Sequence, residues 1–332
     1  MALTVKDIIT ADLLKKTLLV GIDLTDDQGN PYPDELFDAA IDQSISMIEE
    51  ELEITLDKYR FKGERHDLDN DQRRAWYGTQ LDRRPLQSIQ KLQVSYGNYT
   101  PVDIPDAWLN ITSPEGGSVA LIPTAEAIGT FRFNNVLPLL IDPISNYGQY
   151  NRVPAYFKFD YTAGFNFIEQ TITVPVNTNE VSGLLFGEAL VDKPNFIFDV
   201  IDDGNGNVGG ISYDVKAFDL GDDGYSVRMA TTPLQGDATI RVRIHTLPPS
   251  LLKAVLYVAA MLPLDTAGDL LLGAGIGQLS LSVDGLSQNI ASTSSATSAG
   301  YGARILSYER QLKMVMMSLK KKYKTTKLAA GF

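Results

Sequence analysis

The sequence predicts an α+β protein in which helices from both ends of the chain form one core, with a separate all-β domain inserted between them. Two observations predict this class: helical periodicity near both ends, and a series of short β-like segments in the second half. We therefore expect a discontinuous core domain of residues 1–165 and 246–332, with short strands of its own. Residues 166–245 are expected to form an inserted antiparallel β-sandwich or barrel.

The N-terminal part opens with two expected helices. Thr4 and Asp7 have the spacing of a capping box, which predicts a short helix running to about Leu19. A longer helix is expected over 34–57, because apolar residues recur there every three or four positions and share one face. These apolar residues are Phe37, Ile41, Ile45, Ile48 and Leu52. The rest of this helix is rich in acids and contains no Lys or Arg, so it has one apolar and one acidic face.

Strands are expected from Pro85 onward. Short apolar or alternating segments predict strands in the core domain over 89–96, 119–122 and 155–161. The inserted domain has five further strand-like segments, separated by turns rich in Gly and Asp. These segments are 171–176, 196–201, 211–218, 225–229 and 239–244.

Helices return after Pro248. Residues 250–262 are apolar nearly all round, which is typical of a central buried helix. Residues 291–302 are almost entirely Ala, Ser, Thr and Gly, so a flexible or extended arm is expected there. The last helix is expected over 303–323, because it has one apolar stripe. The stripe consists of Ile305, Tyr308, Leu312, Val315 or Met316, Leu319 and Tyr323.

Composition excludes several kinds of chemistry. The 332 residues include no cysteine, which removes disulfides, thiolate metal sites and cysteine nucleophiles. This favours a protein made in a reducing host cytoplasm. The most apolar stretch, Leu251–Leu264, is too short to span a bilayer, so no membrane partner is expected.

Charge is distributed very unevenly along the chain. The net charge is −12, but residues 303–332 carry eight basic residues and one acid, so residues 1–302 total −19. We predict a docking surface for an acidic partner at the basic end, the alternative being a solubilising terminus. Its candidate residues are Lys320, Lys321, Lys322, Lys324 and Lys327. The acidic helix face is interpreted first as a solvated face, and the sharper hypothesis is that a ring of subunits turns it toward a DNA channel, where like charge prevents adhesion. Its candidate residues are Asp38, Asp42, Glu49, Glu50 and Glu53.

Two loop motifs match ligand-binding patterns without their structural context. Residues 204–209 read G-x-G-x-x-G, but a strand is expected to follow rather than the helix that a dinucleotide site requires, which favours a hairpin turn. Asp203, Asn205 and Asn207 have calcium-loop spacing, with Asp214 at the twelfth position. Val208 occupies the position that requires glycine, so no calcium site is predicted.

The remaining polar residues do not single out a catalytic site. His66 lies in a charged segment expected to be a loop, where Asp67 is a conceivable partner for it as a base. His245 ends an expected strand and is interpreted as structural. Carboxylate pairs of the kind that glycosidases use are abundant, but none stands out. We therefore predict no catalytic residue, no cofactor and no metal.

Four segments, in this order, resemble the head–tail connector (adaptor) proteins of tailed phages. The first is a Leu-Thr start to a short helix, an Asp-rich turn, and a helix ending at Met47–Ile54. The second, Arg84-Pro85-Leu86-Gln-Ser-Ile89, resembles the start of that family's first strand. The third, Phe159–Phe165, resembles its Tyr-x-Ala-Gly-aromatic ending. The fourth, Leu247–Val255, resembles a Pro-led, Ala-rich helix that follows sooner in the family. The resemblance covers about residues 1–165 and 246–262.

The resemblance implies a non-enzymatic virion protein located in the neck, between capsid and tail. It implies a homo-oligomeric ring, usually of about twelve copies, that contacts the portal and a tail or head-completion protein. Viral double-stranded DNA would pass through the lumen without specific binding. The alternatives are another virion protein, such as a capsid accessory or baseplate component, and a carbohydrate-active enzyme that uses the β insert.

Overall fold

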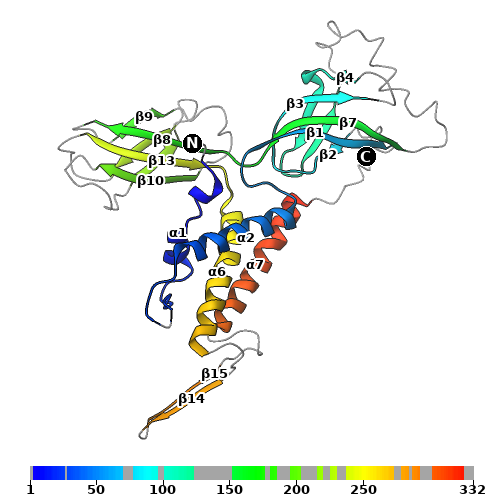
Figure 1. Cartoon of the computed structure of the whole chain (residues 1–332). Helices are drawn as coiled ribbons and strands as arrows, with labels where there is room; N and C mark the ends of the chain where they lie inside the picture. Colours follow the sequence, from blue (N-terminus) through cyan, green and yellow to red (C-terminus); the bar gives the residue numbers. More distant parts are fainter. Residues whose placement is uncertain are drawn as a thin grey trace. The chain divides into compact units, whose positions relative to one another are not determined.

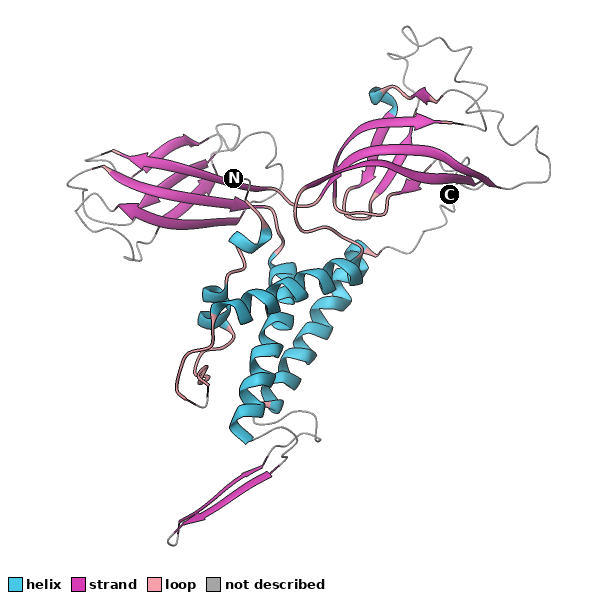
Figure 2. Cartoon of the chain, in the orientation of Figure 1, coloured by secondary structure: helices cyan, strands magenta, loops and turns pink. Residues whose placement is uncertain are grey.

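The computed structural model is a mixed α+β protein whose sheets are antiparallel (Figures 1 and 2). It describes residues 3–26, 28–69, 78–95, 101–122, 152–175, 180–184, 195–202, 215–219, 225–229, 237–272, 278–283, 286–291 and 301–324. The chain divides into two compact units. We call Met1–Ile8 with Phe165–Pro248 the β unit, and Ile9–Gly164 with Pro249–Phe332 the main unit.

The β unit contains two three-stranded antiparallel sheets. One has the order β10-β13-β8 and the other the order β11-β12-β9. The strands of the first are β8 (Phe167–Val174), β10 (Asn195–Asp202) and β13 (Ala238–His245). The strands of the second are β9 (Glu180–Leu184), β11 (Val215–Asp219) and β12 (Tyr225–Met229).

The central strand of the first sheet shows why this segment forms a strand. Along β13, every second residue is buried and apolar, whereas Arg241 between them is exposed. The buried residues are Ala238, Ile240, Val242 and Ile244. The short 3-10 helix η1 (Val5–Asp7) also belongs to this unit, and its Asp7 carbonyl accepts a hydrogen bond from Arg243. The expected capping box of Thr4 and Asp7 is present at the start of η1.

In the main unit, helices α2 and α7 both pack against α6. The helices are α1 (Ala11–Thr17), α2 (Asp34–Leu52), α6 (Pro249–Leu272) and α7 (Gly302–Tyr323). The expected apolar face of α2 is buried, and so are Tyr308, Leu319 and Tyr323 of the stripe on α7.

Two helix boundaries differ from the prediction. The first expected helix is divided, since η1 ends at Asp7 and α1 begins only after Thr10, whose hydroxyl accepts from the Leu13 N–H. The second expected helix ends at Leu52 rather than near 57, because Glu53 adopts a left-handed conformation with φ 55°.

Helix α6 is longer than the sequence indicated, because it continues through Pro263 to Leu272. Its segment Pro249–Gly268 is long and apolar enough to cross a membrane, by length and composition only. The expectation that this stretch is too short is therefore wrong. More than half of that segment is buried against the rest of the protein, as in the core helix of a globular protein.

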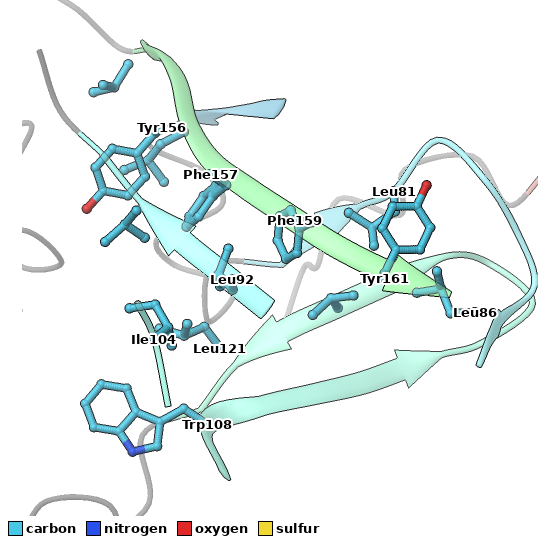
Figure 3. Packing of buried hydrophobic residues seen from close by; sticks show 14 of the residues in the cluster. Leu81, Leu86, Leu92, Ile104, Trp108, Leu121, Tyr156, Phe157, Phe159 and Tyr161 are labelled. Carbon is cyan, nitrogen blue, oxygen red and sulfur yellow. The ribbon is translucent and has the colours of Figure 1, made fainter. Parts of the chain in front are cut away.

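The β part of the main unit encloses an aromatic core (Figure 3). One sheet has the order β1-β7-β3-β4 and the other β2-β6-β5. The strands of the first are β1 (Tyr59–Asp69), β3 (Leu86–Val94), β4 (Val102–Asp103) and β7 (Arg152–Ala163). Those of the second are β2 (Thr79–Gln80), β5 (Leu109–Ser113) and β6 (Ser118–Leu121). The side chains of Phe157, Phe159 and Tyr161 from β7 lie in this core, as does Trp108 of the short helix η2 (Asp106–Trp108).

A hairpin follows α6, where the sequence predicted no strand. It consists of β14 (Gln278–Val283) and β15 (Leu286–Ala291), paired in register without a bulge. Residues 292–300 of the expected flexible arm lie outside the described residues, as do residues 211–214 of one expected strand.

Candidate functional site

The two charged surfaces expected from the sequence meet where α2 and α7 end. Lys320 Nζ lies 2.5 Å from Glu51 Oε1, and Lys324 Nζ lies 3.7 Å from Glu53 Oε1. Lys322 pairs at 3.4 Å with Glu115, in the turn between β5 and β6. Three of the five candidate docking lysines therefore have acidic partners within the chain. Lys321 is exposed, and Lys327 lies outside the described residues.

Arg84 anchors this junction from inside the protein. It is only 5% exposed, and its guanidinium donates to the Tyr323 carbonyl at the end of α7 and to Glu53 Oε2 at 3.0 Å. The backbone of Arg84 also holds the chain after α2, because its carbonyl accepts from the Thr55 N–H at 2.7 Å. One buried arginine thus connects the ends of α2 and α7 to the start of β3.

The predicted acidic face of α2 is only partly correct. Asp38, Asp42 and Glu50 are exposed. Glu49 is turned inward and half-buried, and it accepts a hydrogen bond from the Leu56 N–H at 2.7 Å. Burial raises the pKa of Glu49 above its usual value, although that hydrogen bond opposes the shift. Glu53 is exposed but follows the helix and pairs with Arg84, so it does not belong to the helix face.

A groove of about 670 Å³ lies where α2, α6 and α7 meet. Its apolar lining includes Met47, Met261 and Met316, and its charged lining includes Glu51, Lys313 and Lys320. Met314 and Met317, on α7, are each 60% exposed. Methionine-rich surfaces adapt to differently shaped partners, so the groove, with Met47, Met261 and Met316 in its lining, is suited to contact another protein.

A polar cluster that the sequence did not predict lies on β1. His66 is in this strand and not in a loop, and its Nε2 lies 2.6 Å from Glu64 Oε1. Glu64 also accepts from the Asp82 N–H at 2.9 Å and from the Tyr161 hydroxyl. The expected partner of His66 was Asp67, but Asp67 instead accepts from the Ala155 N–H at 2.6 Å.

These contacts determine the ionisation of the cluster. Burial favours the neutral form of Glu64, but the hydrogen bonds from His66, Tyr161 and the Asp82 N–H outweigh it and hold the pKa of Glu64 below its usual value. Burial, together with the adjacent Glu64 carboxylate, raises the pKa of the Tyr161 hydroxyl. Glu64 and Asp82 form a carboxylate pair of the kind that glycosidases use. The general acid of such a pair needs a raised pKa, so Glu64, whose pKa is lowered, does not suit that role.

The other candidates contribute no site among the described residues. His245 is buried and stacks on the Phe167 ring with 6.3 Å between centroids, and burial lowers its pKa. The glycine-rich segment 204–209 and the calcium-like loop that begins at Asp203 lie outside the described residues.

No protein-family model matches this sequence, and no curated protein shows detectable similarity to it.

Proposed function

We propose that this chain is a structural protein of a tailed-phage particle, a head–tail connector that forms a ring between the portal and the tail. In this proposal the protein acts by fitting against its neighbours, has no catalytic role, and is located in the neck of the virion. Helices from both parts of the chain form one core body, and residues 166–245 form a β-sandwich inserted in sequence between those parts. The contacts of α2 and α7 with α6 support the single helical body.

The observation that carries the proposal is the exposed acidic stripe on α2. Asp38, Asp42 and Glu50 fall on one line at four-residue spacings, with Ser46 between them, and all four are exposed. Asp38 and Asp42 are like charges four residues apart, an arrangement that costs a helix about 0.2–0.5 kcal/mol, and α2 contains no Lys or Arg. A ring that directs this stripe toward its lumen would repel the phosphates of passing DNA and prevent adhesion.

The basic end of α7 would contact an acidic surface of the portal or of a tail-side protein. The ion pairs of Lys320, Lys322 and Lys324 involve partly exposed side chains, and such pairs typically contribute about 0–1 kcal/mol. A partner's carboxylates can therefore replace Glu51, Glu53 and Glu115 at low cost. A truncation at Lys320 would also remove Tyr323, which is fully buried and whose carbonyl Arg84 binds, so docking is better tested by replacing the docking lysines with glutamine.

Two measurements test the proposal. Quantitative mass spectrometry and imaging of purified particles should find about twelve copies located at the neck. Hundreds of copies over the shell would instead support a capsid accessory protein, and a location on the distal tail would support a baseplate component. Turnover of a glycan by the purified chain would support an enzyme and contradict the proposal.

The role of the acidic stripe is tested by reversing its charge. Particles carrying Asp38→Lys, Asp42→Lys and Glu50→Lys together should assemble but eject DNA more slowly, and the defect should weaken as salt is added. A control triple, Asp12→Lys, Asp106→Lys and Glu169→Lys, changes exposed acids elsewhere. Equal ejection by both triples would show that the stripe is only a solvated face.

A further inference from the structure

We propose that Glu64, His66 and Asp82 bind one divalent transition-metal ion, of which Zn²⁺ is the representative. The metal-ligating atoms of these three side chains all lie within 4.8 Å of one another. Two ligand atoms that each lie about 2.0–2.2 Å from the same zinc ion cannot be more than about 4.4 Å apart, so only small side-chain rotations are needed. This inference does not depend on the connector function.

Strand geometry explains why the first two ligands come together. Glu64 and His66 are two residues apart on β1, so their side chains project from the same side of the strand. Asp82 belongs to the segment between β2 and β3 and is held beside them by the hydrogen bond from its N–H to Glu64 Oε1 at 2.9 Å. Imidazole and carboxylate ligands suit zinc, manganese and iron better than calcium, which prefers oxygen ligands alone.

The surroundings of the ligands resemble the outer shell of a metal site. The Tyr161 hydroxyl donates to Glu64 Oε2, and the same hydroxyl oxygen accepts from the Arg83 N–H at 3.2 Å. These bonds fix the orientation of the Glu64 carboxylate, as hydrogen-bond partners of metal ligands generally do. The His66 ring is also held edge-on against Phe159, with 5.9 Å between centroids and an interplanar angle of 77°.

Charge and access also favour a cation. Two carboxylates converge here on a single imidazole. Among the described residues, no ion pair joins Asp82 to a basic side chain. Asp82 is exposed, whereas the side chains of Glu64 and His66 are 14% and 16% exposed, so an ion can enter from one side and keep a water ligand.

The composition of the chain makes the test unusually clear. There are no cysteines and two histidines, so an imidazole ligand can come only from His66 or His245. We would treat the full chain with EDTA, remove the chelator, and titrate it with ZnCl₂ by calorimetry. The expected result is one ion per chain. His66→Gln should weaken binding at least about tenfold, and so should Asp82→Asn.

His245→Gln is the matched control, because it changes the other histidine and should leave zinc affinity unchanged. Nuclear magnetic resonance of the two histidine rings provides a second readout that does not depend on how well a variant folds. Zinc should shift the His66 signals of the unmodified protein and leave those of His245 in place. Absence of one-to-one binding, unchanged affinity in His66→Gln, or a shift at His245 alone would overturn the proposal.

Discussion

Replacing Gly164 with alanine should destabilise the main unit strongly, because the backbone of another segment passes directly over this residue. Gly164 has φ +110°, and an added Cβ would lie 2.1 Å from the Asp57 carbonyl oxygen and 2.8 Å from Lys58 Cα. Its N–H donates to the Pro85 carbonyl at 2.9 Å, and its carbonyl accepts from the Gln87 amide at 2.6 Å. These two bonds limit how far Gly164 can move away from Asp57.

The magnitude follows from two contributions. Positive φ costs a residue with a Cβ roughly 1–2 kcal/mol. Relief of the clash requires the Asp57 backbone to shift by about 1 Å, and overpacking of this kind costs roughly 1–3 kcal/mol. We expect Gly164→Ala to lose about 2–5 kcal/mol of unfolding free energy in total. Gly21→Ala is the matched control, because Gly21 also has positive φ, at +76°, but has no atom within 4 Å of its added Cβ.

Urea denaturation followed by tryptophan fluorescence measures the difference. Trp108 belongs to the main unit and is fully buried in its aromatic core. The midpoint should fall much further in Gly164→Ala than in Gly21→Ala at an unchanged denaturant slope. Equal losses in the two variants would show that the close approach to Asp57 has no energetic effect and would refute the reasoning.

The remaining predictions concern buried charged groups. Arg84→Met should cost roughly 2–4 kcal/mol, because it removes hydrogen bonds to the Tyr323 carbonyl and to Glu53, and it should expose the end of α7 to trypsin. Glu64→Gln should destabilise the protein at pH 7, because the pKa of Glu64 is lower in the folded protein than its unfolded value of 4.5. The ionised carboxylate therefore stabilises the fold at pH values above 4.5, and this stabilisation is lost as the pH falls through the folded pKa. Glu49→Gln should act in the opposite direction and stabilise at pH 7, because burial raises the pKa of Glu49 and the folded protein gains stability as this group is protonated.

Each of these predictions has a simple check. Arg83→Met, at an exposed arginine next in sequence, is the control for Arg84→Met, and equal trypsin sensitivity would argue against the anchor. Thermal unfolding from pH 3 to pH 7 tests the two glutamates. The difference between each variant and the unmodified protein should shrink toward acidic pH, and a pH-independent difference would contradict the assigned causes.

The elements that were predicted well are those with regular local patterns. The apolar face of α2 and the stripe on α7 follow helical spacing, and β13 has a buried apolar residue at every second position from Ala238 to Ile244. The capping box at Thr4 was correct for the same reason, since its two residues are three positions apart. In each case the residues that decide the structure are close neighbours in the sequence.

Strand β1 was missed because its pattern is irregular. It is the edge strand of its sheet, where charged side chains are common, and bulges between Lys62 and Glu64 and between His66 and Leu68 break the alternation. The end of α2 was misplaced for a related reason. Leu56 continues the four-residue spacing of Ile48 and Leu52, yet it lies after the left-handed turn at Glu53, a conformation for which the sequence has no glycine.

The candidate site could be predicted only in part. Clusters of like charge are visible in the sequence, but the pairing of Lys320 with Glu51 and the contact of Arg84 with Tyr323 join segments more than two hundred residues apart. The cluster of Glu64, His66 and Asp82 was not predicted, because two of its residues lie on β1, a segment that was expected to be a loop. With β1 recognised, the two-residue spacing of Glu64 and His66 would have placed both side chains together.

The grouping of residues 1–8 with residues 165–248 has a consequence for synthesis. Val5 and Ile8 are translated before the sheets of their unit, which follow only after more than 150 further residues. These two side chains therefore lack their partners while residues 9–164 are being made. Slower translation of residues 9–164 should prolong that exposure and favour capture of the nascent segment by chaperones.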